Sequence, residues 1–178
     1  MTEPRNTETA RPLFEAWEET MILSCLQGVM GKVFVNDAEH PTSACAAVGC
    51  FSFLAGAPDE MLAKHKPEKF SILVPKDGRW NEVIERCHPN ARRITRYAIK
   101  KDTLFDRGKL EGFCAILPDG YEMRPIDGEL YYKCLNSTLA SDFVSSFDSR
   151  EHFLKLGIGY VILKDGMIVS GASSYTRY

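Results

Sequence analysis

The amino-acid sequence predicts an α/β (α+β) protein in which helices flank a mixed β-sheet. Apolar residues recur every three or four positions over residues 11–28 and 79–87, which is typical of amphipathic helices. Short runs rich in β-branched residues stand at 70–74 and 92–100, so strand, helix and strand follow one another as in a parallel βαβ unit. The Asp165-Gly166 turn between two apolar runs predicts an antiparallel hairpin. Parallel and antiparallel pairs together predict a mixed sheet.

The N-terminal half begins with residues 1–10, which we expect to be mobile, and with the helix over 11–28. Gly28 and Gly31 end this helix. The run 43–54 is interpreted as a strand interrupted by a bulge near Gly49, although its alanine-rich start also fits a helix. The elements predicted up to residue 74 are strands at 32–36, 43–54 and 70–74, and a helix at 57–65 that buries Met61 and Leu62.

In the C-terminal half, Pro125 restricts its strand to the edge or end of a sheet, because proline cannot donate a ladder hydrogen bond. The predicted elements are helices at 106–111, 127–135 and 136–143, and strands at 113–117 and 121–126. A soft boundary near residues 101–107 divides the chain. We therefore expect an N-terminal α/β domain at 11–105 and a second domain at 106–178.

The last thirty residues are predicted to form a short helix and a hairpin. Asp148 is the expected N-cap, Glu151 stands where it can bond back to that cap, and Gly157 is the expected left-handed stop. The hairpin strands, 158–163 and 167–175, are apolar on both faces, which indicates an interior position in a sheet. We therefore expect a further strand beyond Tyr178, which would make this sequence a fragment.

Composition excludes several classes of protein. Apolar residues make up 44% and charged residues 26% of the chain, and the net charge is −2, so nothing indicates binding to nucleic acid or to a membrane surface. No apolar stretch approaches the ~20 residues of a membrane span, and the N-terminus is not a signal peptide, so we expect a cytoplasmic protein. The six cysteines show no zinc spacing and are expected to be free buried thiols.

Other groups of reactive side chains have a simpler interpretation. The Cys87-His88 pair ends a helix and better fits a core cysteine than a nucleophile, and Glu151 is already explained by capping. Residues 92–96 hold three arginines, which fit the solvated face of a strand as well as an anion site. The four histidines stand apart in the sequence and do not predict a metal site.

Three runs carry a resemblance to a known family. The terminal run holds Gly157, Gly159-Tyr160 and Asp165-Gly166 at characteristic spacing. It follows two upstream runs, Met21 to Gly31 and Gly49 to Gly56, in the expected order. Together they resemble GNAT-type N-acetyltransferases, closest to the branch that includes the zwittermicin-resistance acetyltransferases. Cys50 departs from that pattern, which has an acidic residue there. The terminal run would be the first part of a GNAT-like domain.

The resemblance implies acetyl-CoA as co-substrate, a small-molecule amine as acceptor and no metal. In such an enzyme the strand of Ser173, Ser174 and Tyr175 faces the acceptor pocket, where a hydroxyl or phenol would bind the acceptor or act as an acid. Cross-strand hydrogen bonding explains the same residues and is the favoured interpretation. No catalytic or CoA-binding residue is assigned, and the N-terminal part would select the acceptor.

One expected motif is not found in residues 1–178. A GNAT enzyme holds the CoA pyrophosphate on an Arg/Gln-x-x-Gly-x-Gly/Ala loop that opens a helix, and residues 107–112 lack its spacing. The resemblance places that loop after the next strand. Two alternatives therefore remain: a non-catalytic binding or dimerisation module that uses its terminal strand, with a homodimer as its form, and a thiol enzyme with one fast-reacting cysteine.

Overall fold

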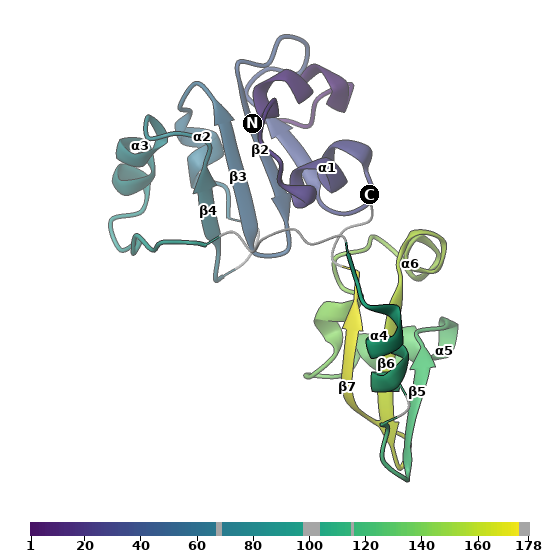
Figure 1. The fold of residues 1–178 in the computed structure, drawn as a ribbon. Helices are drawn as coiled ribbons and strands as arrows, with labels where there is room; N and C mark the ends of the chain where they lie inside the picture. Colours follow the sequence, from purple (N-terminus) through teal and green to yellow (C-terminus); the bar gives the residue numbers. More distant parts are fainter. Residues whose placement is uncertain (67–68, 98–103, 115, 175–178) are drawn as a thin grey trace.

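The fold is given by a computed structural model that describes residues 1–66, 69–97, 104–114 and 116–174 (Figure 1). The elements of the first half are the 3-10 helices η1 (Thr7–Thr9) and η2 (Arg11–Phe14), then α1 (Thr20–Gln27), β1 (Lys32–Val35), β2 (Ser43–Val48), β3 (Phe51–Gly56), α2 (Glu60–Lys64), β4 (Ile72–Pro75) and α3 (Trp80–Cys87). Those of the second half are α4 (Arg107–Cys114), β5 (Tyr121–Pro125), α5 (Gly128–Leu135), η3 (Ser141–Phe143), α6 (Arg150–Leu156), β6 (Gly159–Lys164) and β7 (Met167–Ser173).

The first sheet has the strand order β1-β2-β3-β4 and is mixed, as predicted. Its first three strands are antiparallel, and β4 lies parallel to β3. Side chains alternate between its faces, as the two-residue period of a strand requires. Ala46 and Phe53 belong to the core that includes α1, whereas Cys45 and Leu54 belong to a second core with Trp80 of α3. Helices therefore cover both faces of this sheet, α1 on one and α2 and α3 on the other (Figure 1).

The second sheet is antiparallel, with the order β5-β6-β7. Val161 and Leu163 of β6 are buried in the core shared with Leu130 of α5 and Phe153 of α6. Tyr160, which precedes Val161 in sequence, points to the other face and is 48% exposed. Helices therefore cover one face of this sheet among the described residues. The strand β5 lies at an edge, as Pro125 predicted.

The predicted helix over residues 11–28 is divided in two. The chain leaves the helical path after η2, and Ala16 adopts a left-handed conformation with φ 60°. This break turns the Trp17 ring onto Phe53 of β3 in an edge-to-face contact with ring centroids 5.7 Å apart. Helix α1 then runs from Thr20 to Gln27, and Gly28 ends it at φ 67°, as expected. The contact of the indole with the sheet therefore outweighs the helical periodicity of the local sequence.

Two strand predictions in the first half were wrong in detail. Residue Gly49 is not a bulge; with φ 53° it lies in the tight turn that joins β2 and β3 into a hairpin. Residues 92–97 form no strand, and 98–100 lie outside the described residues, so the parallel pair is β3 with β4 across α2. Arg96 instead lies over the Phe51 ring at 5.0 Å and pairs with Glu19, which holds this segment against the first sheet without ladder bonds.

The segment 113–117 is also not the predicted strand. Phe113 and Cys114 end helix α4, residue 115 lies outside the described part, and Ile116 is 70% exposed. None of the described residues of this apolar run is buried. Met61, expected in the core, is 59% exposed on α2, while its neighbour Leu62 is fully buried.

The closing helix begins and ends differently from the prediction. Ser149, not Asp148, is the N-cap of α6, and its hydroxyl accepts a hydrogen bond from the His152 N–H at 3.1 Å. Gly157 has φ −81°, so it is not a left-handed stop. It is needed for space instead, because a Cβ there would lie 2.5 Å from the Phe153 ring. The hairpin turn at Asp165-Gly166, with φ 50° and 73°, is as predicted.

Candidate functional site

Two of the predicted acceptor-binding residues, Ser173 and Ser174, lie at the end of β7, where their hydroxyl groups bond within the protein. The Ser173 hydroxyl donates to the carbonyl of Phe143 in η3, at 2.5 Å. The Ser174 hydroxyl accepts from the Ile158 N–H at 3.0 Å, and the Ser174 N–H donates to the Ile158 carbonyl at 2.6 Å. Tyr175 lies outside the described residues. Both serines join β7 to neighbouring segments, and a role in acceptor binding stays a prediction.

Two glycines let these neighbouring segments come close to the sheet. A Cβ at Gly171 of β7 would lie 2.6 Å from the Phe143 ring and 2.8 Å from the Tyr160 carbonyl oxygen. A Cβ at Gly159 would lie 2.6 Å from the Ile126 side chain. These distances are well inside van der Waals contact. Glycine at position 171 therefore gives Phe143 of η3 room to pack on β7, and glycine at position 159 gives room to the Ile126 side chain.

The strand β7 is an edge of the second sheet among the described residues. Ile162 pairs with Ser170 and Leu163 with Ile168, so Val169 is an extra residue that forms a β-bulge. An edge strand presents unpaired backbone donors and acceptors on its outer side. We had expected an interior strand, and Val169 is instead 40% exposed. The edge of β7 is chemically suited to accept another strand or an extended ligand.

The histidines are engaged in structural contacts. The His88 Nε2 lies 2.8 Å from the Ala63 carbonyl oxygen, and the His65 ring packs on Phe34 with centroids 4.4 Å apart. Burial lowers the pKa of His65 below its ordinary value. His152 Nδ1 lies 3.9 Å from an Asp148 carboxylate oxygen. Within the described ranges, no group of three His, Cys, Asp or Glu side chains is placed to hold a metal ion.

The cysteines are free thiols, and their burial varies more than the sequence predicted. Cys25, Cys45 and Cys134 are buried, Cys50 and Cys87 are half-buried, and Cys114 is exposed on α4. Burial raises the pKa of both Cys25 and Cys45 to about 12, which disfavours the reactive thiolate.

Two surface hollows lie in or beside the first half of the chain. One has a volume of about 430 Å³ and lies between η2 and α1, with Phe14, Trp17 and Leu26 among its lining residues. The other, about 220 Å³, is lined by Val48, by His65 and by Ser146 from the second half of the chain. Sequence reasoning missed the first hollow because a helix continued through residues 15–19 leaves no space there. The described helices include none that is long and apolar enough to cross a membrane.

Comparison with known proteins identifies the family. The family model of GNAT acetyltransferases matches residues 11–178, and the chain belongs to the GNAT acetyltransferase family. Its structure is similar to the crystal structure of a GCN5-related N-acetyltransferase-like protein from Streptococcus suis, with a TM-score of 0.86 and 43% sequence identity. That similarity covers 97% of this chain and 71% of the other chain. A search of curated proteins finds no match.

Proposed function

We propose that this protein takes part in the transfer of an acetyl group from acetyl-CoA to an amine of a small molecule. The observation that carries the proposal is the family match over residues 11–178, supported by the 43% identical neighbour. GNAT acetyltransferases use acetyl-CoA as their co-substrate, and the two-sheet α/β fold found here is similar to that neighbour throughout. Within the family we place the chain in the zwittermicin-resistance branch, on the three runs that resemble it.

The chemistry requires a neutral amine to attack the thioester carbonyl. A C–N bond forms, the C–S bond breaks and CoA leaves as the thiolate; the proton lost by the nitrogen is passed through a base or water to that thiolate, which gives the CoA thiol. We propose that the end of β7 contacts the acceptor through Ser173, Ser174 or Tyr175. For Ser173 this requires its hydroxyl to bond the acceptor in place of, or in addition to, the Phe143 carbonyl. Among the described residues we assign no base.

No residue of this chain is assigned to CoA either, because residues 1–178 contain no pyrophosphate loop of the family form. We propose that this sequence is a fragment and that the complete gene product carries the loop beyond a strand pairing with β7. The unmatched part of the Streptococcus suis chain is in keeping with this proposal, since the similarity covers 71% of that chain.

The test uses the complete gene product, titrated with acetyl-CoA in a calorimeter and then assayed for release of CoA thiol with a panel of small primary amines. We expect saturable binding and thiol release with at least one amine. Ser174→Ala should raise the KM for the amine, whereas Ser170→Ala, on the same strand but outside the proposed contact, should leave it unchanged. A complete protein that does not bind acetyl-CoA would exclude this function.

A second function rests on the open edge of β7, which suits a non-catalytic binding or dimerisation module, including a homodimer. In this case two chains would pair their β7 strands, and the 178-residue chain would sediment as a stable dimer. Val169→Pro should abolish that dimer, because the bulge residue has no partner in β6 and the proline disturbs mainly the outer edge. Val169→Thr is the matched control. A monomeric wild-type chain would exclude the homodimer.

A further inference from the structure

The second sheet has an apolar face on the side away from α5 and α6. Val161 and Leu163 of β6 point toward those helices, so Tyr160 and Ile162, which alternate with them, point to the opposite side. The register of the ladder places Met123 of β5 beside Ile162. Tyr160 and Met123 are each 48% exposed. We call the surface formed by Met123, Tyr160 and Ile162 the open face.

Helix α4 carries an apolar face of its own that is not buried. Leu110 and Phe113 stand three residues apart, and Cys114 follows Leu110 by four, so the three side chains share one side of the helix. Leu110 is 49% and Phe113 59% exposed, and Cys114 is exposed as well. An eight-residue helix gains too little from its own hydrogen bonds to be stable in water, so packing of this face would stabilise it.

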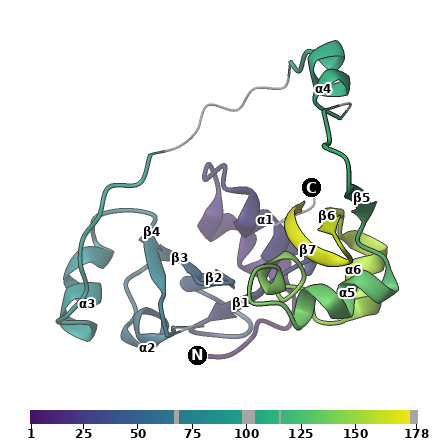
Figure 2. The ribbon, with the colours of Figure 1, turned by 90° about the horizontal axis from the view of Figure 1, so that it is seen from below.

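The position of α4 in the chain keeps it near the open face. Six residues, 115–120, connect the end of α4 to the first residue of β5, and an extended connection of this length spans about 25 Å at most. Figure 1 shows α4 in front of the second sheet, and Figure 2 shows that sheet between α4 and the helices α5 and α6. The open face is therefore turned toward α4, and the short connection gives the helix a high effective concentration there.

We propose that α4 closes onto the open face as a lid, with Leu110 and Phe113 packed against Met123, Tyr160 and Ile162. Removal of this apolar surface from water drives the closure. The closed position exchanges with the open position described above, from which α4 remains accessible to reagents and proteases. Closure does not depend on the acetyl transfer proposed above, and its test contains no acetyl-CoA.

The experiment traps the closed position with a disulfide in the complete gene product. Met123→Cys introduces a thiol on the open face. Glu122→Cys is the matched control, because Glu122 is the preceding residue of β5, pairs with Leu163 and points to the other side of the sheet. A disulfide with Cys114 requires the two Cα atoms to come within ~7 Å of each other. Under mild oxidation of dilute protein, we expect this disulfide to form about tenfold faster in Met123→Cys than in the control.

Further variants test whether the apolar face of α4 drives the closure. The double variant Leu110→Ala with Phe113→Ala, made in the Met123→Cys background, should slow formation of the disulfide about tenfold, because the apolar contact is lost while alanine preserves the helix. Glu111→Ala, on a different side of α4, should leave the rate unchanged. Peptide mapping by mass spectrometry identifies the linked cysteines, and circular dichroism checks that each variant is folded.

Three results would overturn the proposal. The first is no disulfide between Cys114 and the thiol introduced by Met123→Cys, which would mean that α4 stays open. The second is an equal rate in the Glu122→Cys control, which would reflect only the short connection between α4 and β5. The third is a disulfide that joins two chains, seen in the intact mass, which would make the open face a contact between copies.

Discussion

At the scale of single residues, Gly31 is constrained in two ways: its φ is positive, and there is no space for a side chain. It has φ 72°, and a Cβ there would lie 2.6 Å from the Val48 Cβ and 2.9 Å from the Cys25 sulfur. Gly28, three residues earlier, has nearly the same φ of 67° but nothing within 4 Å of an added Cβ. The two glycines therefore separate the cost of backbone strain from the cost of overpacking.

We predict that Gly31→Ala lowers the free energy of unfolding by roughly 2–4 kcal/mol, the sum of a left-handed alanine and an overpacked core. Gly28→Ala should lower it by roughly 1 kcal/mol, from backbone strain alone. Urea denaturation followed by circular dichroism measures both. Equal losses in the two variants would mean that the close contacts around Gly31 relax at no cost.

The buried thiols give a second prediction at this scale, and it also tests the thiol-enzyme interpretation. Because the pKa of Cys25 and Cys45 is about 12, their thiolate is scarce at pH 8. We expect iodoacetamide to label the exposed Cys114 first and these two last, with peptide mapping by mass spectrometry as the readout. All should react alike in urea. Rapid labelling of Cys25 or Cys45 in the folded protein would contradict this prediction.

The same thiols make stability depend on pH in the alkaline range. Their pKa is raised on folding from an ordinary value near 9.0 to about 12. Their contribution is therefore complete below pH 9, where both states hold the proton, and is lost as pH rises from about 9 to about 12.

At the scale of elements, the start of α6 distinguishes two neighbouring caps. The Ser149 hydroxyl accepts the His152 N–H, whereas Asp148 makes no contact at the cap position beyond its distant approach to the His152 ring. We predict that Ser149→Ala destabilises the protein by about 1 kcal/mol, the usual value for a lost cap. Asp148→Ala should have little effect, because the His152 N–H at the start of the helix is bonded by Ser149. Thermal unfolding at pH 8 measures the stability of both variants. A larger loss of stability in Asp148→Ala than in Ser149→Ala would identify Asp148 as the N-cap.

Elements set by local interactions are those that the sequence predicted well. The Asp165-Gly166 turn needs only positive φ at two residues, and Asp127 caps α5 by accepting the N–H groups of Glu129 and Leu130, contacts made within three residues. The segment 92–97 depended instead on a distant partner. Its sequence pattern is typical of a strand, but residues 92–97 form no strand. Arg96 instead contacts Phe51 and Glu19, which are distant in sequence.

The candidate sites also divide into features set by local sequence and features set by distant contacts. The position of Ser173 on a terminal strand followed from the hairpin, but its bond to Phe143, thirty residues away, has no sequence signal. The hollow beside Trp17 could not be predicted without knowing that the helix breaks at Ala16. The Lys76 ammonium holds this segment through hydrogen bonds to the carbonyl oxygens of Leu13 and Glu15. Only a tertiary contact with the first sheet explains that break.

At the scale of the whole molecule, the described residues of the segment between the two sheets are mostly exposed. Helix α4 has no buried residue, and Figure 2 shows it standing away from both sheets. Next to it in sequence, Leu104 is 87% and Phe105 72% exposed, and Ile94, earlier in the same segment, is 65% exposed. An isolated eight-residue helix is marginal in water, since helices shorter than ~12–15 residues gain too little from their own hydrogen bonds. The division near residue 105 stays a prediction that protease can test.

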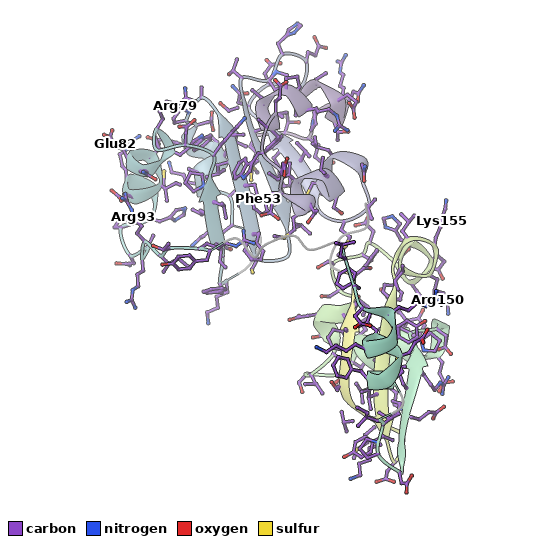
Figure 3. The ribbon with its side chains drawn as sticks, in the orientation of Figure 1. Phe53, Arg79, Glu82, Arg93, Arg150 and Lys155 are labelled. Atoms are coloured by element: carbon purple, nitrogen blue, oxygen red, sulfur yellow. The ribbon has the colours of Figure 1, made fainter. Side chains whose placement is uncertain are left out.

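We predict that the first cuts by trypsin in the folded protein fall between Arg92 and Lys109, because a protease needs a segment that can leave the structure at low cost. The Lys133 ammonium of α5 donates to the Gly166 carbonyl at 2.5 Å, between the strands of the β6–β7 hairpin, so Lys133 should be cut later. The same is expected of Lys155, which lies on α6 (Figure 3). Mass spectrometry of a time course identifies the sites. If Lys133 or Lys155 is cut first, α5 and α6 open more easily than the connecting segment, and the boundary near residue 105 is not a boundary between independently packed parts.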